Sequence, residues 1–303
     1  MKLSNNLKEN HILILSAGAL CISFAPIFVK LVGDNILGPT AIAFWRLLFG
    51  AIILSVWILF SGGSFKMSRS FVKYPLLAGA LFFLDLFLWH RSIIITGAGM
   101  ATILGNTQVF GTAILSFIIF KEKLSLRFFG AAGAAIFGVV LLVGLGSDIN
   151  FSSRYIEGIL FGLGTGVVYS NYIVTLKMAG SKKECPKILS LMFWVTLISA
   201  VITGISSLLE SSPTIPPNIE TVIILVSLAL VAQALGWWFI ASSLPKVEGS
   251  RSGLILLLQP VLATLWGFLI FQEQLSKIQL LGAVITLVAI YAGSIKKAAK
   301  TAA

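Results

Sequence analysis

The chain alternates between long apolar runs and short polar clusters. A helix needs about 20 apolar residues to cross the hydrocarbon core of a bilayer, and ten runs of about that length occur. They cover residues 12–31, 39–60, 74–92, 97–120, 128–146, 156–176, 188–209, 221–243, 250–271 and 278–295. The longest connection, around residues 210–220, contains three prolines and cannot be helical throughout. The pattern predicts an all-α integral membrane protein with ten transmembrane helices.

Composition agrees with this prediction and excludes several other classes of protein. The 303 residues are 57% hydrophobic and 11% charged, with a mean hydropathy of +1.00, whereas soluble domains are about 25% charged. The net charge of +11 would suit nucleic acid only if the basic residues shared one solvated face. They lie instead in short clusters between apolar runs, so we expect no nucleic-acid partner. The two cysteines, Cys21 and Cys185, imply no disulfide scaffold, and we expect no metal and no cofactor.

The basic residues lie mainly on one side of the predicted membrane. With the N-terminus inside, 17 of the 22 Lys and Arg residues fall in inside segments, and only Arg154 and Lys277 fall in outside loops. Cytoplasmic loops carry the excess of Lys and Arg, so both termini are expected in the cytoplasm. No small-residue cleavage site follows the first apolar run, which we interpret as a retained span. We expect a multi-pass protein of the plasma membrane, of the bacterial inner-membrane type.

An internal repeat divides the chain into two units. The segment FIIFKEKLS at residues 117–125 matches FLIFQEQLS at residues 268–276 with an offset of 151, which also pairs Gln108 with Gln259. The units are residues 12–146, with spans one to five, and residues 156–295, with spans six to ten. Because five is odd, the second unit enters the membrane from the opposite side. Inverted repeats are typical of secondary transporters; a duplicated structural or assembly protein that transports nothing is the alternative.

Three segments carry a resemblance to a known family. They are QPVLATLWGFLIFQEQLS at residues 259–276, NTQVFGTAILSFIIFKEKLS at 106–125 and AFWRLLFGA at 43–51. The chain resembles the drug/metabolite transporter superfamily, specifically its ten-span EamA group with two EamA repeats. The resemblance implies transport of small metabolites, including amino acids. It also implies a bend or gate at Pro260, whose repeat mate is Val109, so the first half is expected to lack that bend.

Asp85 is the acidic residue that lies deep in a predicted span. It is about 11 residues into the span, or roughly 16 Å at about 1.5 Å per residue, which is near the midplane. An ionisable group there is a functional hypothesis by default. Asp85 either binds a protonated amine or couples transport to a proton, or it is a structural ion-pair partner of Arg46 or Arg91. Trp89 shares its helix face, and Arg46 either faces the cavity to bind a carboxylate or extends toward the outer interface.

The remaining candidates are polar or aromatic residues deep in other spans. They are Asn106, Gln108, Tyr169, Gln233, Trp237 and Gln259, for which the alternatives are hydrogen bonds between helices or, for the tryptophan, lipid-facing volume. The basic residues near span ends, Lys30, Arg91 and Lys177, are interpreted as headgroup anchors. Glu122 and its repeat mate Glu273 are interpreted as stabilising the start of the following helix.

These residues favour a secondary-active carrier of small metabolites, most simply amino acids or related amphipathic compounds, working by alternating access, with proton coupling as a further hypothesis. Arg46 and Asp85 together would accept both ends of a zwitterion if they face one cavity. The alternatives are a carrier of a larger metabolite such as S-adenosylmethionine or a nucleotide sugar, and a membrane assembly factor. An intramembrane enzyme would need a catalytic pair that one Asp and one His do not supply, so no enzyme is expected. The oligomeric state is expected to be a monomer or a homodimer.

Overall fold

A computed structural model describes residues 2–32, 36–96, 98–143, 152–272 and 276–294. Every regular element in these ranges is helical, and they contain no strand. The first part of the chain forms α1 (Lys2–Ser23), α2 (Ala25–Val32), α3 (Pro39–Phe60), α4 (Lys73–Thr96), α5 (Ala98–Asn106), α6 (Gln108–Phe120) and α7 (Leu126–Val143). The second forms α8 (Ser153–Gly180), α9 (Ile188–Leu208), α10 (Ile219–Leu228), the π-helix η1 (Ala229–Gly236), α11 (Trp237–Ser243), the 3-10 turn η2 (Leu244–Lys246), α12 (Gly249–Leu256), α13 (Leu258–Phe271) and α14 (Lys277–Ser294).

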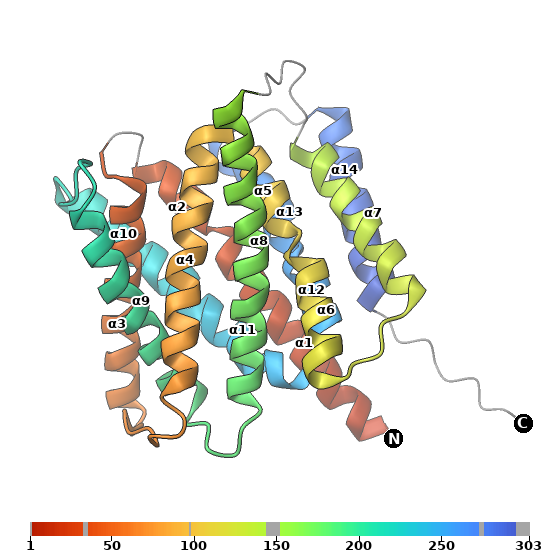
Figure 1. Cartoon of the computed structure of the whole chain (residues 1–303), viewed down its shortest axis with the longest axis horizontal. Coiled ribbons are helices and arrows are strands. Elements are labelled where there is room, and N and C mark those ends of the chain that lie inside the picture. Colours follow the sequence, from red (N-terminus) through yellow and green to blue (C-terminus); the bar gives the residue numbers. More distant parts are fainter. Residues whose placement is uncertain (1, 33–35, 97, 144–151, 273–275, 295–303) are drawn as a thin grey trace, which may run out of the picture.

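The all-α membrane class is confirmed, whereas the number of spans stays a prediction. In the described ranges, eight helical stretches are long and apolar enough to cross a membrane. Two shorter apolar helices, at Leu126–Leu141 and Lys277–Gly293, occupy the positions of the predicted fifth and tenth spans. These two helices pack side by side as α7 and α14 (Figure 1). Close approach there depends on Gly138, because a Cβ at this position would meet the Thr286 side chain and the α14 backbone.

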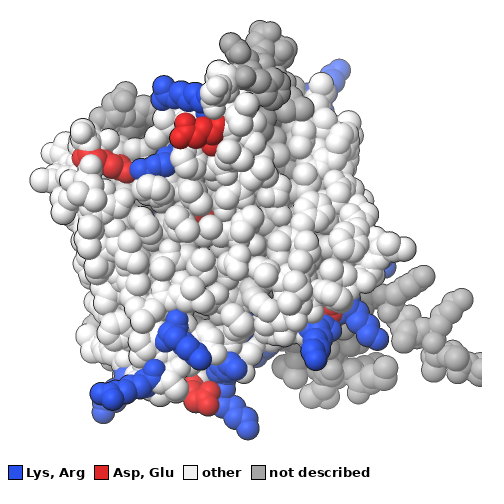
Figure 2. Space-filling model, viewed as in Figure 1, with Lys and Arg blue, Asp and Glu red and all other residues white. Residues whose placement is uncertain are grey.

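Charged residues are nearly absent from the middle of the surface seen in Figure 2. Figure 2 shows Lys and Arg gathered at the lower end, a smaller mixed group at the upper end and an almost uncharged band between them. We call the lower end the basic end; it holds the loops at residues 61–72, 121–125 and 181–187 (Figure 1). The opposite end holds the loop at residues 209–218. The band is the surface that a bilayer would cover, because charged side chains are costly in hydrocarbon.

The spans at residues 101–120 and 249–271 are both interrupted. Helix α5 ends and α6 begins around Thr107, and α12 and α13 meet at Leu257. The second break lies close to Pro260, and a gating role for this residue stays a prediction. The prediction that the first half lacks the bend is wrong, since α5 and α6 are separate although Val109 stands where the other half has proline. The break therefore does not require the ring of a proline.

Both interrupted spans also end in the same unusual conformation. Lys121 after α6 has φ 54°, and Gln272 after α13 has φ 56°; both are left-handed, and neither is glycine. The backbone N–H of each residue returns to the carbonyl five residues earlier, on Ser116 and Gly267 respectively. These pairs keep the sequence offset of 151, so the backbone repeats together with the sequence. Glu273 lies outside the described residues.

Candidate functional site

Arg46 is fixed inside the bundle by a partner from the other half of the chain. It lies on α3 with 9% of its surface exposed, and its Nε donates to Oε1 of Gln233 on η1 at 3.1 Å. The amide Nε2 of Gln233 then donates to Thr196 Oγ1 on α9 at 3.1 Å. A Cβ at Gly50 would collide with the Gln233 side chain, so this glycine allows α3 to approach η1. Arg46 therefore faces the interior, and the alternative in which it extends outward is excluded.

Asp85 is buried near Arg46 but is not joined to it by an ion pair. It lies on α4 with 8% exposure, and its Oδ1 has no hydrogen-bond partner. Arg46 is close enough to influence this carboxylate electrostatically, yet no ion pair within 4.0 Å joins the two among the described residues. The alternative pairing with Arg91 is wrong, because Arg91 pairs with Glu210 at 3.3 Å. Asp85 thus presents a buried acceptor without a donor.

Three aromatic rings form a wall beside these charges. Phe82 stacks on Tyr172 at 4.8 Å between ring centroids, and the edge of Trp237 meets both rings at 5.2 and 4.8 Å. The Arg46 guanidinium lies 5.9 Å from the centroid of Phe82. The hydroxyl of Tyr172 and the indole Nε1 of Trp237 are buried without a partner. Two donors and one acceptor are therefore unsatisfied in one region, where a buried polar group normally has a partner.

Tyr169 and Gln259 extend this cluster. The Tyr169 ring lies 6.1 Å from that of Trp237, and Gln259 Nε2 donates to the Tyr169 hydroxyl at 3.3 Å. The structure thus gathers six of the nine predicted site residues into one region, which we call the central cluster. Its members are Arg46, Asp85, Tyr169, Gln233, Trp237 and Gln259, together with Phe82, Tyr172 and Thr196. Phe82 and Thr196 are absent from the sequence-based predictions. The sequence shows that they lie deep in spans, but it does not show which residues they contact.

The other three predicted residues make contacts elsewhere. Gln108 donates to the Gly253 carbonyl at 3.3 Å and accepts from Thr112, so it ties α6 to α12. Asn106 donates to the carbonyl of Thr102 on its own helix at 2.8 Å. Trp89 is half-buried, with its ring 5.4 Å from that of His90. The bond of Gln108 matches the alternative of a hydrogen bond between helices, whereas that of Asn106 stays within its own helix.

Lys177 and Glu122 depart from their sequence-based interpretation. Neither anchors at a headgroup or simply begins a helix, because Lys177 is 5% exposed and donates to Glu122 Oε1 at 2.5 Å. The sequence offers one signal, which is that Glu122 has a repeat mate in Glu273. Hydropathy places both at span ends and gives no information about burial there.

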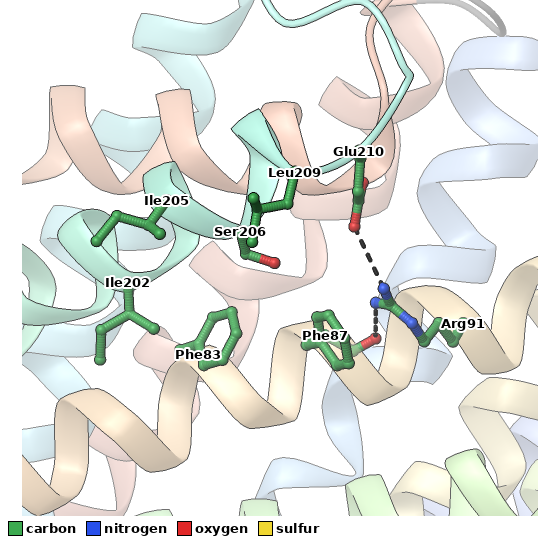
Figure 3. Close-up of a pocket in the computed structure, with 8 residues that line it drawn as sticks. All are labelled: Phe83, Phe87, Arg91, Ile202, Ile205, Ser206, Leu209 and Glu210. Carbon is green, nitrogen blue, oxygen red and sulfur yellow. Dashed lines mark hydrogen bonds and ion pairs between the residues drawn. The ribbon is translucent and has the colours of Figure 1, made fainter.

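An open groove lies at the opposite end of the molecule. Cavities of about 470 and 340 Å³ adjoin there and share the Arg91–Glu210 pair. The larger runs between α4 and α9 and is lined by Phe83, Phe87, Ile202, Ile205, Ser206 and Leu209 (Figure 3). Arg91 lies over the Phe87 ring and also donates to the Phe87 carbonyl. The larger cavity is mainly apolar with one ionic contact at its end, whereas polar residues, among them Thr40, His90 and Ser211, line the smaller one.

The chemistry of the central cluster suits recognition of a ligand. A guanidinium, a carboxylate, a hydroxyl and an indole N–H offer both signs of charge and both kinds of hydrogen bond beside an aromatic surface. The described residues contain no group of three or more His, Cys, Asp or Glu that could hold a metal ion.

Comparison with known proteins finds one family twice in this chain. The profile of the EamA-like transporter family matches residues 10–144 and again residues 156–294. A crystal structure of another protein superposes with a TM-score of 0.81 at 15% identity, covering 94% of this chain and 96% of that one. At that identity the likeness concerns the fold alone.

Three sequence relatives have names that mention transport. Two, from Escherichia coli (strain K12) and Salmonella typhimurium, are each named "Probable amino-acid metabolite efflux pump" and are 27% and 26% identical over 202 residues. The matched region is 64% of this chain and 66% of each relative, so the chain spans slightly less than two thirds of their length. An "Uncharacterized transporter" from Archaeoglobus fulgidus is 24% identical over 274 residues, which cover 89% of this chain and 92% of that protein.

Proposed function

This chain belongs to the EamA-like transporter family, and we propose that it carries a small zwitterionic metabolite through the central cluster by alternating access. The observation that carries the proposal is the unsatisfied Oδ1 of Asp85, buried near the cationic fork of Arg46. Leaving a buried acceptor without a partner costs about 1–3 kcal/mol. A ligand with a donor at that place would recover this free energy.

The geometry favours a substrate with an ammonium group and a carboxylate. Asp85 would accept from the ammonium, and the Nη atoms of Arg46 would bind the carboxylate, since Nε is held by Gln233. The hydroxyl of Tyr172 and the indole N–H of Trp237 would donate to oxygens of the same ligand, and the rings would cover its apolar part. The two relatives named as probable amino-acid metabolite efflux pumps support this class and suggest export. Transport, rather than catalysis, is the function we assign.

The proposed architecture is ten spans in two inverted units, residues 12–146 and 156–295, in the plasma membrane with both termini in the cytoplasm. The matching helix breaks near Thr107 and Leu257 support the two units, as do the matching left-handed residues Lys121 and Gln272. Broken helices near the midplane of inverted repeats are typical of transporters. In this proposal Pro260 lies beside one break and helps to set its position. The carrier functions as a monomer or homodimer.

Coupling to protons is a further part of the proposal. Asp85 would take up a proton when the substrate ammonium leaves it, which avoids an isolated charge near the middle of the bilayer. We expect an Asp85→Asn protein to bind substrate weakly and to lose accumulation driven by a pH difference. Accumulation that persists in Asp85→Asn would refute the coupling role and leave the carrier proposal standing.

A thermal-shift screen of the purified protein tests the substrate class. The panel contains amino acids, nucleosides, S-adenosylmethionine, nucleotide sugars and lipophilic cations. A ligand at a hundredfold excess over its dissociation constant adds about 2.7 kcal/mol to the stability of the folded state. We expect amino-acid-like compounds to raise the melting temperature, and Asp85→Asn and Arg46→Gln to abolish the rise. Glu157→Gln and Arg127→Gln are matched controls on exposed residues and should retain it.

Analogues of a hit separate the roles of the two charges. An amine that lacks the carboxylate should bind equally to the wild type and to Arg46→Gln, while still depending on Asp85. The acid that lacks the ammonium should show the opposite dependence. Hits confined to S-adenosylmethionine or nucleotide sugars would favour a larger substrate, and an empty panel would favour an assembly factor.

A further inference from the structure

A buried ion pair joins the two halves of the chain at the basic end. The ammonium of Lys177, in the last turn of α8, donates to Glu122 Oε1 at 2.5 Å and to the Val247 carbonyl at 2.7 Å. The other carboxylate oxygen of Glu122 accepts from the backbone N–H of Gly249, at the start of α12, at 2.7 Å. The two side chains are only 7% and 15% exposed. One carboxylate that follows α6 therefore holds two segments of the second half.

A contact between a lysine and a phenylalanine ring occurs at both ends, with the halves exchanged. Lys177 lies over the ring of Phe120 at 4.9 Å, and Lys30 at the end of α2 lies over the ring of Phe271 at 4.3 Å. Phe120 and Phe271 are related by the offset of 151, as are the left-handed residues that follow them. Each half thus ends an interrupted span with a phenylalanine that packs against a lysine of the other half.

We propose that these two contacts are the gates of the transport cycle: Lys177 with Glu122 and Phe120 closes the basic end, and Lys30 with Phe271 closes the opposite end. The inference rests on the proposed alternating-access function. It assigns to Lys177, Glu122 and Lys30 a role in positioning the two halves, since none of them belongs to the central cluster. One contact must open for the site to be reached from its side.

The energetics of the buried pair suit a contact that breaks and reforms. Desolvation of a buried ion pair offsets most of its Coulomb attraction, so such pairs contribute little net stability. When the basic end opens, water can solvate both Lys177 and Glu122 again. Closed and open states can therefore be near in free energy, which a carrier that visits both requires.

The two ends differ in how tightly they are closed. At the opposite end the Arg91–Glu210 pair has side chains 30% and 25% exposed and adjoins the two cavities described above (Figure 3). The Lys177–Glu122 pair is more buried. The structure therefore corresponds to a state sealed at the basic end, with the looser packing at the other.

A buried serine beside the pair provides a reporter of opening. Ser116 on α6 is fully buried, its hydroxyl has no partner, and a Cβ at Gly249 would collide with it. We would place Ser116→Cys in a full-length chain that carries Cys21→Ser and Cys185→Ser, in nanodiscs that expose both faces. The rate of labelling by a hydrophilic maleimide then measures how often the basic end opens.

Weakening the gate at the basic end should raise this labelling rate, and weakening the gate at the opposite end should lower it. Lys177→Met should raise the labelling rate of the reporter by about tenfold or more, because it favours the state open at the basic end. Adding Lys30→Met to it should lower the rate again, since both gates are then weakened. Glu122→Gln, which can keep the bond from Gly249, should raise the rate as Lys177→Met does. Lys183→Met, on an exposed loop residue, should have no effect.

The outcomes distinguish a gate from a structural contact. An unchanged rate in both Lys177→Met and Glu122→Gln would refute the proposal, even if transport were lost. A double variant that labels faster than Lys177→Met would also refute it, because general loosening is not reciprocal. The reporter needs no substrate, so the expected pattern in a protein that binds nothing from the panel would support the gates and contradict the proposed substrate class.

Discussion

Replacing Gln233 by leucine should destabilise the protein more than any comparable change of an uncharged polar residue in the central cluster. The substitution removes the acceptor of Arg46 Nε and the donor to Thr196, at a residue with no exposed surface. A hydrogen bond to a charged group is worth about 1.5–3 kcal/mol. A neutral bond between membrane helices adds about 0.6 kcal/mol. The expected loss in the free energy of unfolding is therefore about 2–4 kcal/mol.

Two single variants and one double variant divide this loss. Thr196→Val should cost only about 0.6 kcal/mol, because it removes the neutral bond alone. Gln259→Leu, which removes the bond to Tyr169, is the matched glutamine control and should cost a similar amount. In an Arg46→Met background, Gln233→Leu should lose most of its effect, because no buried charge is then left without a partner.

The measurement is the free energy of unfolding in detergent micelles, from denaturant titrations followed by tryptophan fluorescence. Equal losses for Gln233→Leu and Gln259→Leu would show that the charge on Arg46 does not depend on Gln233. A full loss that persists in the Arg46→Met background would assign the effect to packing of the glutamine side chain against α3. Either result would refute the reasoning.

Three further outcomes follow from the structure. Gly138→Ala should destabilise the α7–α14 contact by about 1–3 kcal/mol in the same unfolding assay, while Gly133→Ala, where a Cβ meets nothing within 4 Å, should not. Burial raises the pKa of the Cys185 thiol to about 11, so little thiolate is present at neutral pH. The alkylation rate of Cys185, measured by mass spectrometry, should therefore rise about tenfold per pH unit from 7 toward 10. A plateau of this rate near pH 8 would contradict the prediction. Glu210→Gln should change the free energy of unfolding by at most about 1 kcal/mol, because its pair with Arg91 is partly exposed, and a larger loss would mean that the pair supports the 209–218 loop.

Much of the fold could be predicted from the sequence, because hydropathy reflects the bilayer as a solvent. Each predicted span overlaps a helix, and the proline-rich segment at residues 210–220 separates α9 from α10 as expected. The break near Thr107 could not be predicted from a missing proline. It lies where α8 packs closely, since a Cβ at Gly166 of α8 would collide with Thr107 itself, and such contacts between helices are not visible in the sequence.

The site was predictable where burial is costly and unpredictable where it depends on partners. Arg46 and Asp85 are identifiable because a charged residue inside a span is energetically costly and is usually there for function. The bond between Arg46 and Gln233 spans 187 residues, and nothing local in the sequence specifies it. Lys177 was misinterpreted for the same reason: its position at a span end fits a headgroup anchor equally well until its partner, Glu122, is known.

The charges of the central cluster come from one half of the chain only. Arg46 and Asp85 lie on α3 and α4, and the positions related to them by the offset of 151 are Leu197 and Gly236. The two halves of such a duplicated scaffold can exchange conformations, but the charged residues that would bind the substrate remain in the first half. Both charged ends of a bound zwitterion would be held by the first half, while Tyr172 and Trp237 of the second half would supply uncharged hydrogen bonds. Substitutions in α3 and α4 could therefore change which compound is carried without disturbing the pairing of the two repeats. Substrate specificity could then evolve while the scaffold stays the same.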